Sequence, residues 1–466
     1  MLFSSLEFLY LFLPFTLLLY FASPPVARNA VLLVVSLAFY GFGEPIYLFL
    51  MLFTIVTDYF FGLAIEQSIR RGGSSKGLLI AAIAVNLSLL GFFKYYDFFA
   101  RTVGLPALEL ALPIGISFYT FQAISYVIDV ARREVAAQKN PVSFGAYVTL
   151  FPQLIAGPIV RYSEIEGALK KRGHSLARIA DGIAVFCVGL SKKVLFANAA
   201  GELCEALLVR LSEPTLRTVL GAWLWLIFFA AQIYFDFSGY SDMAVGLGRI
   251  FGFEFPGNFR YPYTSRSITE FWRRWHITLS SWFREYVYIP LGGNRQGKGK
   301  TLRNLLITWA LTGLWHGAEW NFLLWGVYFF VLLSLEKFVW GKRLERAPSF
   351  LRHIYALFFI LIGWLIFASD GTRAMDGISL GGALLGIGCV AFSDGIVIYE
   401  LVRFLPLLGA MVLGATPLPR MMFYRIADEH PSLAGTVRVA LCAASLLVCT
   451  AYLVDTGYNP FLYFRF

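Results

Sequence analysis

The chain has 466 residues, of which 58% are hydrophobic, 17% aromatic and only 15% charged. This composition excludes an ordinary soluble protein, because soluble domains carry about 25% charged residues. The formal net charge of +10 does not by itself indicate nucleic-acid binding, since membrane proteins concentrate Lys and Arg in their cytoplasmic loops. We therefore expect a membrane protein that contacts lipids and binds no nucleic acid.

Several apolar stretches approach the roughly 20 residues that are needed to cross the hydrocarbon core of a bilayer. Residues 46–65, 78–93, 354–368 and 439–454 are examples. By this length criterion we count about ten to twelve crossings, some of them shortened or broken. Only helices and closed barrels satisfy their backbone in lipid, and the sequence lacks the ten-residue alternation of a barrel. The sequence predicts an all-α polytopic membrane protein.

The distribution of basic residues predicts the orientation of the first half. Arg28 is the first basic residue and follows the first apolar run, and residues 70–76 form another basic loop. These positions place Met1 outside and the basic loops inside. The five cysteines form no C-x-x-C pair and no metal-like spacing, so we expect neither a metal site nor a permanently bound cofactor.

The chain reads as a single integral-membrane domain over residues 1–466. Residues 1–130 are plain spans, and residues 232–326 form a polar core region that we expect to carry the chemistry. Residues 151–165 contain two prolines and a glycine, too many helix breakers for an uninterrupted crossing. This segment is predicted to be re-entrant or interfacial, which requires protein or water to cover its backbone.

The stretch from residue 258 to residue 303 contains nine Lys or Arg and only two acids. This excess predicts a cytoplasmic location. Within it, the aromatic residues Trp272, Trp275, Trp282 and Phe283 indicate that residues 269–288 are amphipathic and pack in or near the membrane interface. His276 lies inside this amphipathic stretch, between Trp275 and Ile277.

Residues 311–325, LTGLWHGAEWNFLLW, place His316 and Glu319 in an otherwise apolar and aromatic run. A buried ionisable residue in a membrane segment is a functional-site hypothesis. Imidazole is also the side chain best suited to transfer a proton near neutral pH. Polar side chains in the same region are further candidates for lining a pore, namely Asp236, Ser238, Glu319 and Asn321.

His276 and His316 are forty positions apart, separated by a basic loop and one apolar segment, so one cavity can hold both imidazoles. Acyl transfer suits such a pair, because a hydroxyl loses its proton as it attacks a thioester carbonyl. A second polar donor would stabilise the oxyanion. The sequence contains no G-x-S-x-G elbow, P-loop or dinucleotide fingerprint, so we expect direct attack rather than a covalent serine intermediate.

Three motifs resemble the membrane-bound O-acyltransferase family: DFSGYSD, FWRRWHITLSSWFREYVYIPLGGNRQG and GLWHGAEWNFLLWG, at residues 236–242, 271–297 and 313–326. Within it they resemble most the bacterial branch with the alginate O-acetyltransferase membrane subunit. FPQLIAGPIVRY and the ending YNPFLYFRF, at residues 151–162 and 458–466, are also similar to that branch. The resemblance covers nearly the whole chain.

This resemblance implies helices around a central pore, with re-entrant or interfacial helices, in the bacterial inner membrane. It implies that His316 is catalytic and that His276 occupies the family's second polar position. It further implies acyl transfer from a cytoplasmic thioester, with acetyl-CoA as the donor substrate, to an exported polysaccharide such as alginate, directly or through a periplasmic acetyltransferase partner. Arg273, Arg274 and Trp315 are our candidates for contacting the donor, because cations attract its phosphates.

Three alternatives remain open at this point. The acceptor can be peptidoglycan, or the reaction can be D-alanyl transfer for teichoic acids from an acyl-carrier protein that docks on the basic loop. Outside the enzymes, a proton-coupled transporter would also place histidines in the membrane. The absence of paired discontinuous helices and of a repeat in the sequence argues against that transporter.

Overall fold

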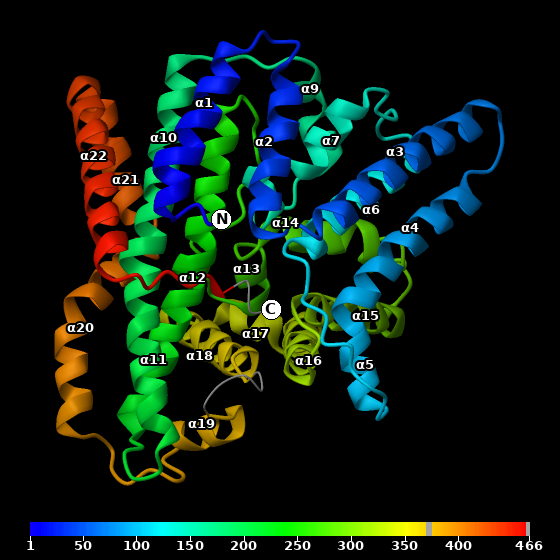
Figure 1. Ribbon diagram of the computed structural model, residues 1–466. Coiled ribbons are helices and arrows are strands. Elements are labelled where there is room, and N and C mark those ends of the chain that lie inside the picture. The colour runs from blue at the N-terminus through cyan, green and yellow to red at the C-terminus, as the bar shows by residue number, and fades with distance from the viewer. Residues whose placement is uncertain (370–374, 463–466) are drawn as a thin grey trace. The chain divides into compact units, whose positions relative to one another are not determined.

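The computed structural model describes residues 1–369 and 375–462 and is helical, apart from one isolated bridge between Thr218 and Ala391 within these residues. The last four residues of the terminal motif, 463–466, lie outside the described part. Two compact units make up the chain: Met1–Cys187 with Tyr240–Gly257, and Val188–Gly239 with Asn258–Phe466. Helices form the secondary structure of both units (Figure 1).

The first unit consists mainly of N-terminal helices, and α10 (Leu176–Ser191) and α12 (Val219–Ile250) contribute to both units. Its other helices are η1 (Phe8–Phe12), α1 (Leu13–Ala22), α2 (Arg28–Gly43), α3 (Leu48–Arg70), α4 (Lys76–Leu90), η2 (Gly91–Tyr95), α5 (Tyr96–Thr102), α6 (Ile116–Arg132), α7 (Pro141–Thr149), α8 (Phe151–Leu154) and α9 (Tyr162–Lys170).

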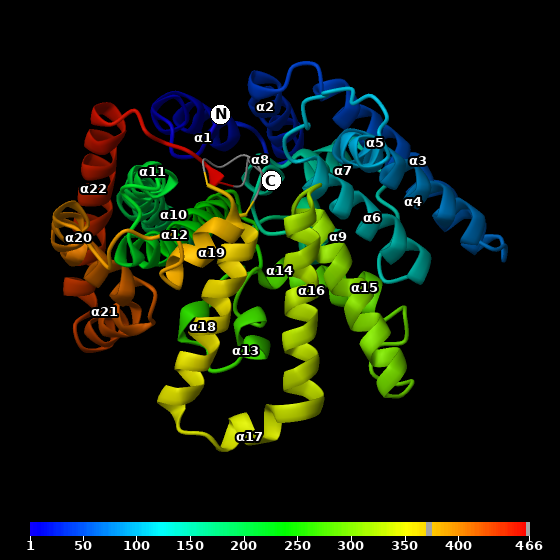
Figure 2. The ribbon, with the colours of Figure 1, turned by 90° about the horizontal axis from the view of Figure 1, so that it is seen from below.

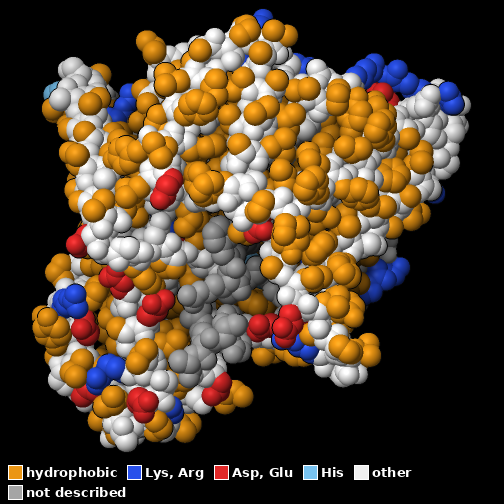
Figure 3. Space-filling view, viewed as in Figure 1, with side chains coloured by type: hydrophobic (Ala, Val, Ile, Leu, Met, Phe, Trp, Pro, Cys, Tyr) orange, Lys and Arg blue, Asp and Glu red, His pale blue; other side chains and the backbone are white. Residues whose placement is uncertain are grey.

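Polar contacts and close packing hold α3, α4 and α6 together. The amide of Asn86 on α4 donates to both carboxylate oxygens of Asp58 on α3, at 2.9 and 3.0 Å. The outer faces of α3 and α4 are rich in hydrophobic side chains (Figure 3). Such exposed apolar faces are expected of helices that contact lipid tails, which solvate them as water cannot.

The prolines and glycine of residues 151–165 interrupt the helical structure, as predicted. After the four-residue helix α8 the backbone is irregular up to α9, and residues 151–160 are all buried. Irregular backbone at membrane depth is tolerated only when protein or water covers it. In this unit, protein covers it.

The second unit contains the C-terminal helices and both candidate histidines. Its remaining helices are η3 (Lys192–Asn198), α11 (Ala199–Ser212), η4 (Pro262–Thr264), α13 (Ile268–Trp272), α14 (Ile277–Phe283), η5 (Arg284–Tyr288), α15 (Lys298–His316), α16 (Trp320–Leu335), η6 (Glu336–Trp340), α17 (Gly341–Arg346), α18 (Ser349–Phe367), α19 (Gly377–Leu384), α20 (Gly395–Gly414), α21 (Leu418–Glu429) and α22 (Pro431–Asp455).

Seven helical stretches among the described residues are long and apolar enough to cross a membrane, and two further apolar helices are shorter. They differ in burial, because 72% of the apolar window of α12 is buried but only 6% of that of α22. Helices such as α6 and α15 do not meet this criterion of length and composition, so fewer spans are found among the described residues than the ten to twelve expected. The expected all-α polytopic membrane fold is confirmed.

A glycine pair brings α15 and α16 unusually close, and the two helices run side by side (Figure 2). A Cβ on Gly313 would lie 2.3 Å from the carbonyl oxygen of Phe322, and one on Gly326 would lie 2.3 Å from that of Trp309. Only glycine permits this backbone approach. The contact fixes the end of α15, where His316 is the last helical residue.

Candidate functional site

His316 sits in an aromatic cage and is 6% exposed. Its imidazole lies 5.0 Å from the rings of Trp315 and Trp325 and 5.5 Å from that of Phe367, measured between centroids. A small cavity adjoins the cage. Its lining comes from α12, α15, α16, α18 and two loop segments, and includes Ile233, Asp236, Phe237, Trp275, His316, Trp325, Trp364, Phe367 and Leu462.

His276 lies beside this cage, with its ring 6.5 Å from that of His316 and 5.8 Å from that of Trp315. Its side chain is fully buried, and burial lowers the pKa of the imidazole to about 3. The ring is therefore neutral at pH 7. The two histidines that the sequence singled out come together within one unit.

The backbone around His276 differs from the expected helix over residues 269–288. The chain forms α13, leaves helical geometry over residues 273–276, and resumes in α14 and η5. His276 itself has φ +45° and ψ 53°, the left-handed conformation. Side chains other than glycine, Asn and Asp rarely adopt it, because their Cβ approaches the following carbonyl. Arg273, Arg274 and His276 therefore do not lie on one continuous helix.

Hydrogen bonds from other segments hold this broken region. The Glu336 carboxylate accepts the backbone N–H groups of Ile268 and Thr269 at 2.6 and 2.8 Å, which fixes the start of α13. Ser267 caps the same helix end by accepting from the N–H of Glu270 at 3.0 Å. A carboxylate at a helix N-terminus also complements the helix dipole. These contacts orient the FWRRWH segment.

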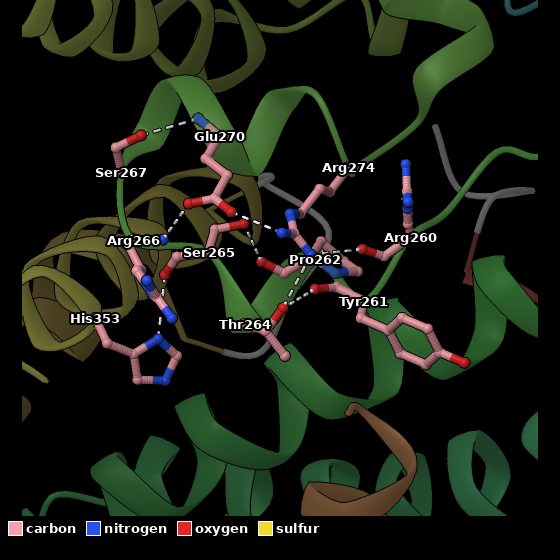
Figure 4. Close-up of polar contacts among 10 residues, drawn as sticks. All are labelled: Arg260, Tyr261, Pro262, Thr264, Ser265, Arg266, Ser267, Glu270, Arg274 and His353. Atoms are coloured by element: carbon pink, nitrogen blue, oxygen red, sulfur yellow. Dashed lines mark hydrogen bonds and ion pairs between the residues drawn. The ribbon is translucent and has the colours of Figure 1, made fainter. Parts of the chain in front are cut away.

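The two arginines of that segment have different surroundings. The Arg274 guanidinium forms a 2.7 Å ion pair with Glu270 and donates to the Thr264 hydroxyl at 3.1 Å (Figure 4). The Arg273 side chain is exposed, and its guanidinium forms no ion pair or hydrogen bond with the described residues. Of the two, Arg273 is the one available to a ligand.

Asp236 lines the cavity but is not an isolated acid. Its carboxylate pairs with the Lys193 ammonium at 2.7 Å and accepts the backbone N–H of Leu462 at 2.8 Å. The Lys193 ammonium also donates to the Pro460 carbonyl oxygen. The pair thus holds the C-terminal segment against α12, with Leu462 in the cavity wall. Lys193 was not among the predicted residues, although a lysine within an apolar run is itself a signal.

The other residues that were predicted to line a pore belong to the same unit, and each has different surroundings. Ser238 is fully buried in α12. Glu319 is the residue that precedes α16. The amide of Asn321 donates to the Phe367 carbonyl oxygen at 3.1 Å, linking the start of α16 to the end of α18. Trp315 is buried rather than at the surface, and its ring packs against both imidazoles.

Comparison with known proteins gives matches over most of the chain. Residues 118–369 match the model of the membrane-bound O-acyltransferase family. The chain is 38% identical to the "Probable alginate O-acetylase" of Azotobacter vinelandii over 100% of both chains. It is 36% identical to the peptidoglycan O-acetyltransferase of Helicobacter pylori, covering 80% of this chain and 78% of the relative. With the teichoic acid D-alanyltransferase of Bacillus subtilis it shares 29% identity over 55% and 68%.

The matched region contains both histidines, the broken FWRRWH segment and the α15–α16 hairpin. An acyltransferase assignment also excludes the transporter that the sequence left open. The chain is a multi-pass membrane O-acyltransferase and belongs to the membrane-bound O-acyltransferase family.

Proposed function

We propose that this protein transfers an acetyl group from a cytoplasmic thioester, acetyl-CoA, across the bacterial inner membrane to hydroxyl groups of an exported polysaccharide such as alginate. The polysaccharide receives the group directly or through a periplasmic acetyltransferase partner. The similarity to a protein named as an alginate O-acetylase over the full length of both chains supports this acceptor class. The observation that carries the chemistry is the pair of buried imidazoles 6.5 Å apart.

His316 is the general base in this proposal. Its imidazole lines the cavity, where a hydroxyl and a thioester carbonyl can meet. The base takes the hydroxyl proton as the oxygen attacks the carbonyl carbon, and it returns the proton to the departing thiolate. The surrounding aromatic rings exclude water, which would otherwise hydrolyse the thioester.

Trp325 is our candidate for stabilising the oxyanion that forms in this step. Its indole is 1% exposed, lines the cavity and lies 5.0 Å from the His316 ring. The indole Nε1–H is buried and finds no acceptor among the described residues. An indole nitrogen can only donate a hydrogen bond. An oxyanion in the cavity would supply the missing acceptor.

Arg273 is proposed to bind a phosphate of the acyl donor. The unpaired, exposed guanidinium supports this role, because Arg binds phosphate through two parallel hydrogen bonds. Arg274 instead stabilises the loop through Glu270 and Thr264. Trp315 packs beside both imidazoles and would contact the acyl group of the donor.

Two other acceptors remain candidates because relatives carry their names. The Helicobacter pylori relative supports peptidoglycan O-acetylation, and the Bacillus subtilis relative supports D-alanyl transfer from a carrier protein. The alginate-type reaction is favoured because that similarity extends over both full chains, whereas the D-alanyltransferase alignment covers 55% of this chain.

The test is transfer by the purified protein in proteoliposomes. Acetyl-CoA, an acetylated carrier protein or a D-alanyl carrier protein is supplied on one side, and oligosaccharides of alginate or peptidoglycan on the other, with and without a periplasmic partner. We expect acetyl esters on alginate oligosaccharides with acetyl-CoA alone as the donor. Transfer only from a D-alanyl carrier protein would contradict the proposal.

A further inference from the structure

Asn258, which lies 18 positions before His276, forms several hydrogen bonds with the segment around His276. Its side-chain oxygen faces three donors: the Thr278 backbone N–H at 3.2 Å, the Thr278 hydroxyl at 2.9 Å and Nδ1 of His276 at 3.2 Å. Its backbone carbonyl accepts the N–H of Ile277 at 3.0 Å. Asn258 is 2% exposed. A single buried residue therefore binds three consecutive positions at the break before α14.

These contacts determine which way the Asn258 amide points. A backbone N–H can only donate, so the side-chain atom that faces the Thr278 N–H is the oxygen and not the NH2 group. The same oxygen faces Nδ1 of His276. An oxygen cannot donate, so Nδ1 carries the hydrogen in this contact.

The tautomer of His276 follows from this assignment. A neutral imidazole has one N–H, so a hydrogen on Nδ1 leaves a lone pair on Nε2. Nε2 is buried and has no hydrogen-bond partner among the described residues. The ring is neutral at pH 7 because burial disfavours its charged form. His276 thus offers a buried acceptor that no described donor uses.

The His276 ring lies beside the proposed base, 6.5 Å from the His316 ring between centroids. It borders on Phe237 and Trp275, which line the cavity. The rings that pack on His276 come from α12 (Phe237), the following loop (Phe259) and α15 (Trp315 and His316). His316 is the titratable group among them. The left-handed backbone of His276 is adjacent to the Asn258 contacts with residues 277 and 278, which offset its strain.

We propose that Asn258 is a positioning residue that holds His276 in the Nδ1–H tautomer, so that its Nε2 accepts a hydrogen bond from the attacking hydroxyl. This inference rests on the proposed function. His276 then orients the hydroxyl while His316 takes the proton, and the neutral His276 ring cannot donate from Nε2 to the oxyanion. The division of roles explains why a ring so weakly basic lies beside the base.

The direct test is nitrogen-15 NMR of the purified full-length protein with labelled histidine, with the His276 signals assigned by subtraction of His276→Gln. We expect an unprotonated Nε2 in the parent at pH 7 and a shift toward the Nε2–H form in Asn258→Leu. Asn304→Leu removes a buried amide of the same unit that bonds Gly293 and serves as the control, with no change at His276 expected. A protonated Nε2 in the parent would overturn the inference.

The steady-state kinetics provide a second measurement, because a change in kcat at constant KM differs from the effect of unfolding. Asn258→Leu should lower kcat by about 10² with an unchanged KM for the donor, because ground-state binding does not use this contact. Asn258→Asp keeps the acceptor and should restore most of the turnover, with its acidic limb moved to higher pH. The acidic limb moves to higher pH because a carboxylate at Nδ1 raises the pKa of His276. The ring is then protonated at higher pH, and a protonated ring has no lone pair on Nε2.

The outcomes separate this inference from the proposed reaction. The expected tautomer together with no acyl transfer by the parent would refute the proposed function and leave the tautomer assignment standing. Normal transfer in which Asn258→Leu and Asn258→Asp both retain the kcat and pH profile of the parent would refute the positioning role. Because Asn258→Asp preserves the acceptor oxygen, it keeps the test decisive if Asn258→Leu fails to fold.

Discussion

The two imidazoles of the site lie 6.5 Å apart but are positioned by different physical means. His316 ends a regular helix whose placement depends on the close approach of Gly313 and Gly326. His276 lies in a break between two short helices, in a left-handed conformation, and depends on hydrogen bonds to Asn258. Tight packing positions the first ring and a polar network positions the second. Substitutions in the two regions should therefore fail in different ways.

The largest effect should come from His316. His316→Ala is expected to lower acetylation by about 10² to 10⁴, because the general base is lost. His276→Ala should cause a smaller loss, and the double variant should be little slower than His316→Ala, since orienting a hydroxyl has no value without a base. The acetate bound to the polymer is measured for each variant at equal amounts of protein in the membrane. His430→Ala, at an exposed position, serves as the control. If the activity losses of the two single variants added up fully in the double variant, the two histidines would not act in the same step.

A loss of about 10² in kcat is expected for Trp325→Phe, the size typical of losing one oxyanion donor. The substitution keeps an aromatic ring beside His316, removes the buried Nε1–H and makes the ring smaller. Trp320→Phe, at an exposed position of the same helix, should leave the rate unchanged. Steady-state kinetics measure kcat for both variants. An equal kcat for the two variants would mean that Trp325 does not stabilise the oxyanion.

The packing region can be disturbed without touching polar groups. Gly313→Ala should lower the free energy of unfolding by about 1 to 3 kcal/mol, because its Cβ would meet the Phe322 carbonyl oxygen and force α15 and α16 apart. Gly435→Ala places its Cβ in open space on α22 and is the matched control. Thermal unfolding in detergent compares the two. Equal stability would refute the close approach of α15 and α16.

The smallest effect concerns the acyl donor. Arg273→Ala should raise the KM for acetyl-CoA about tenfold by removing a charge-assisted hydrogen bond. Arg274→Ala should leave this KM unchanged and instead reduce stability, because Glu270 and Thr264 lose their partner. Donor titration in inverted vesicles separates them. Unchanged apparent affinity in both variants would mean that Arg273 only anchors the segment to lipid headgroups.

The apolar segments and the burial of both histidines could be predicted from sequence, because each is expressed in local composition. Length and hydropathy predict the long helices, and an imidazole within Trp-rich sequence stands out against the apolar background. Pro152 and Pro158 likewise predict the interruption after α8, because proline lacks the N–H that a continuous helix needs. These are properties of a residue and its immediate neighbours.

The break at His276 could not be predicted in this way. The pattern over residues 269–288 is compatible with one amphipathic helix, and nothing local requires a left-handed histidine. The conformation depends on Asn258, which is distant in sequence. The same holds for the Lys193–Asp236 pair, whose partners lie on different helical segments. Tertiary contacts of this kind override local preferences.

The most direct test of the account is a single-turnover measurement with purified protein in sealed proteoliposomes, using labelled acetyl-CoA on the donor side and an alginate oligosaccharide on the other. The parent protein should transfer label to the oligosaccharide, and His316→Ala at the same density should bind the donor normally but transfer label at least about 10² more slowly. Transfer by His316→Ala at the parental rate would contradict the claim that the buried imidazole pair performs the reaction.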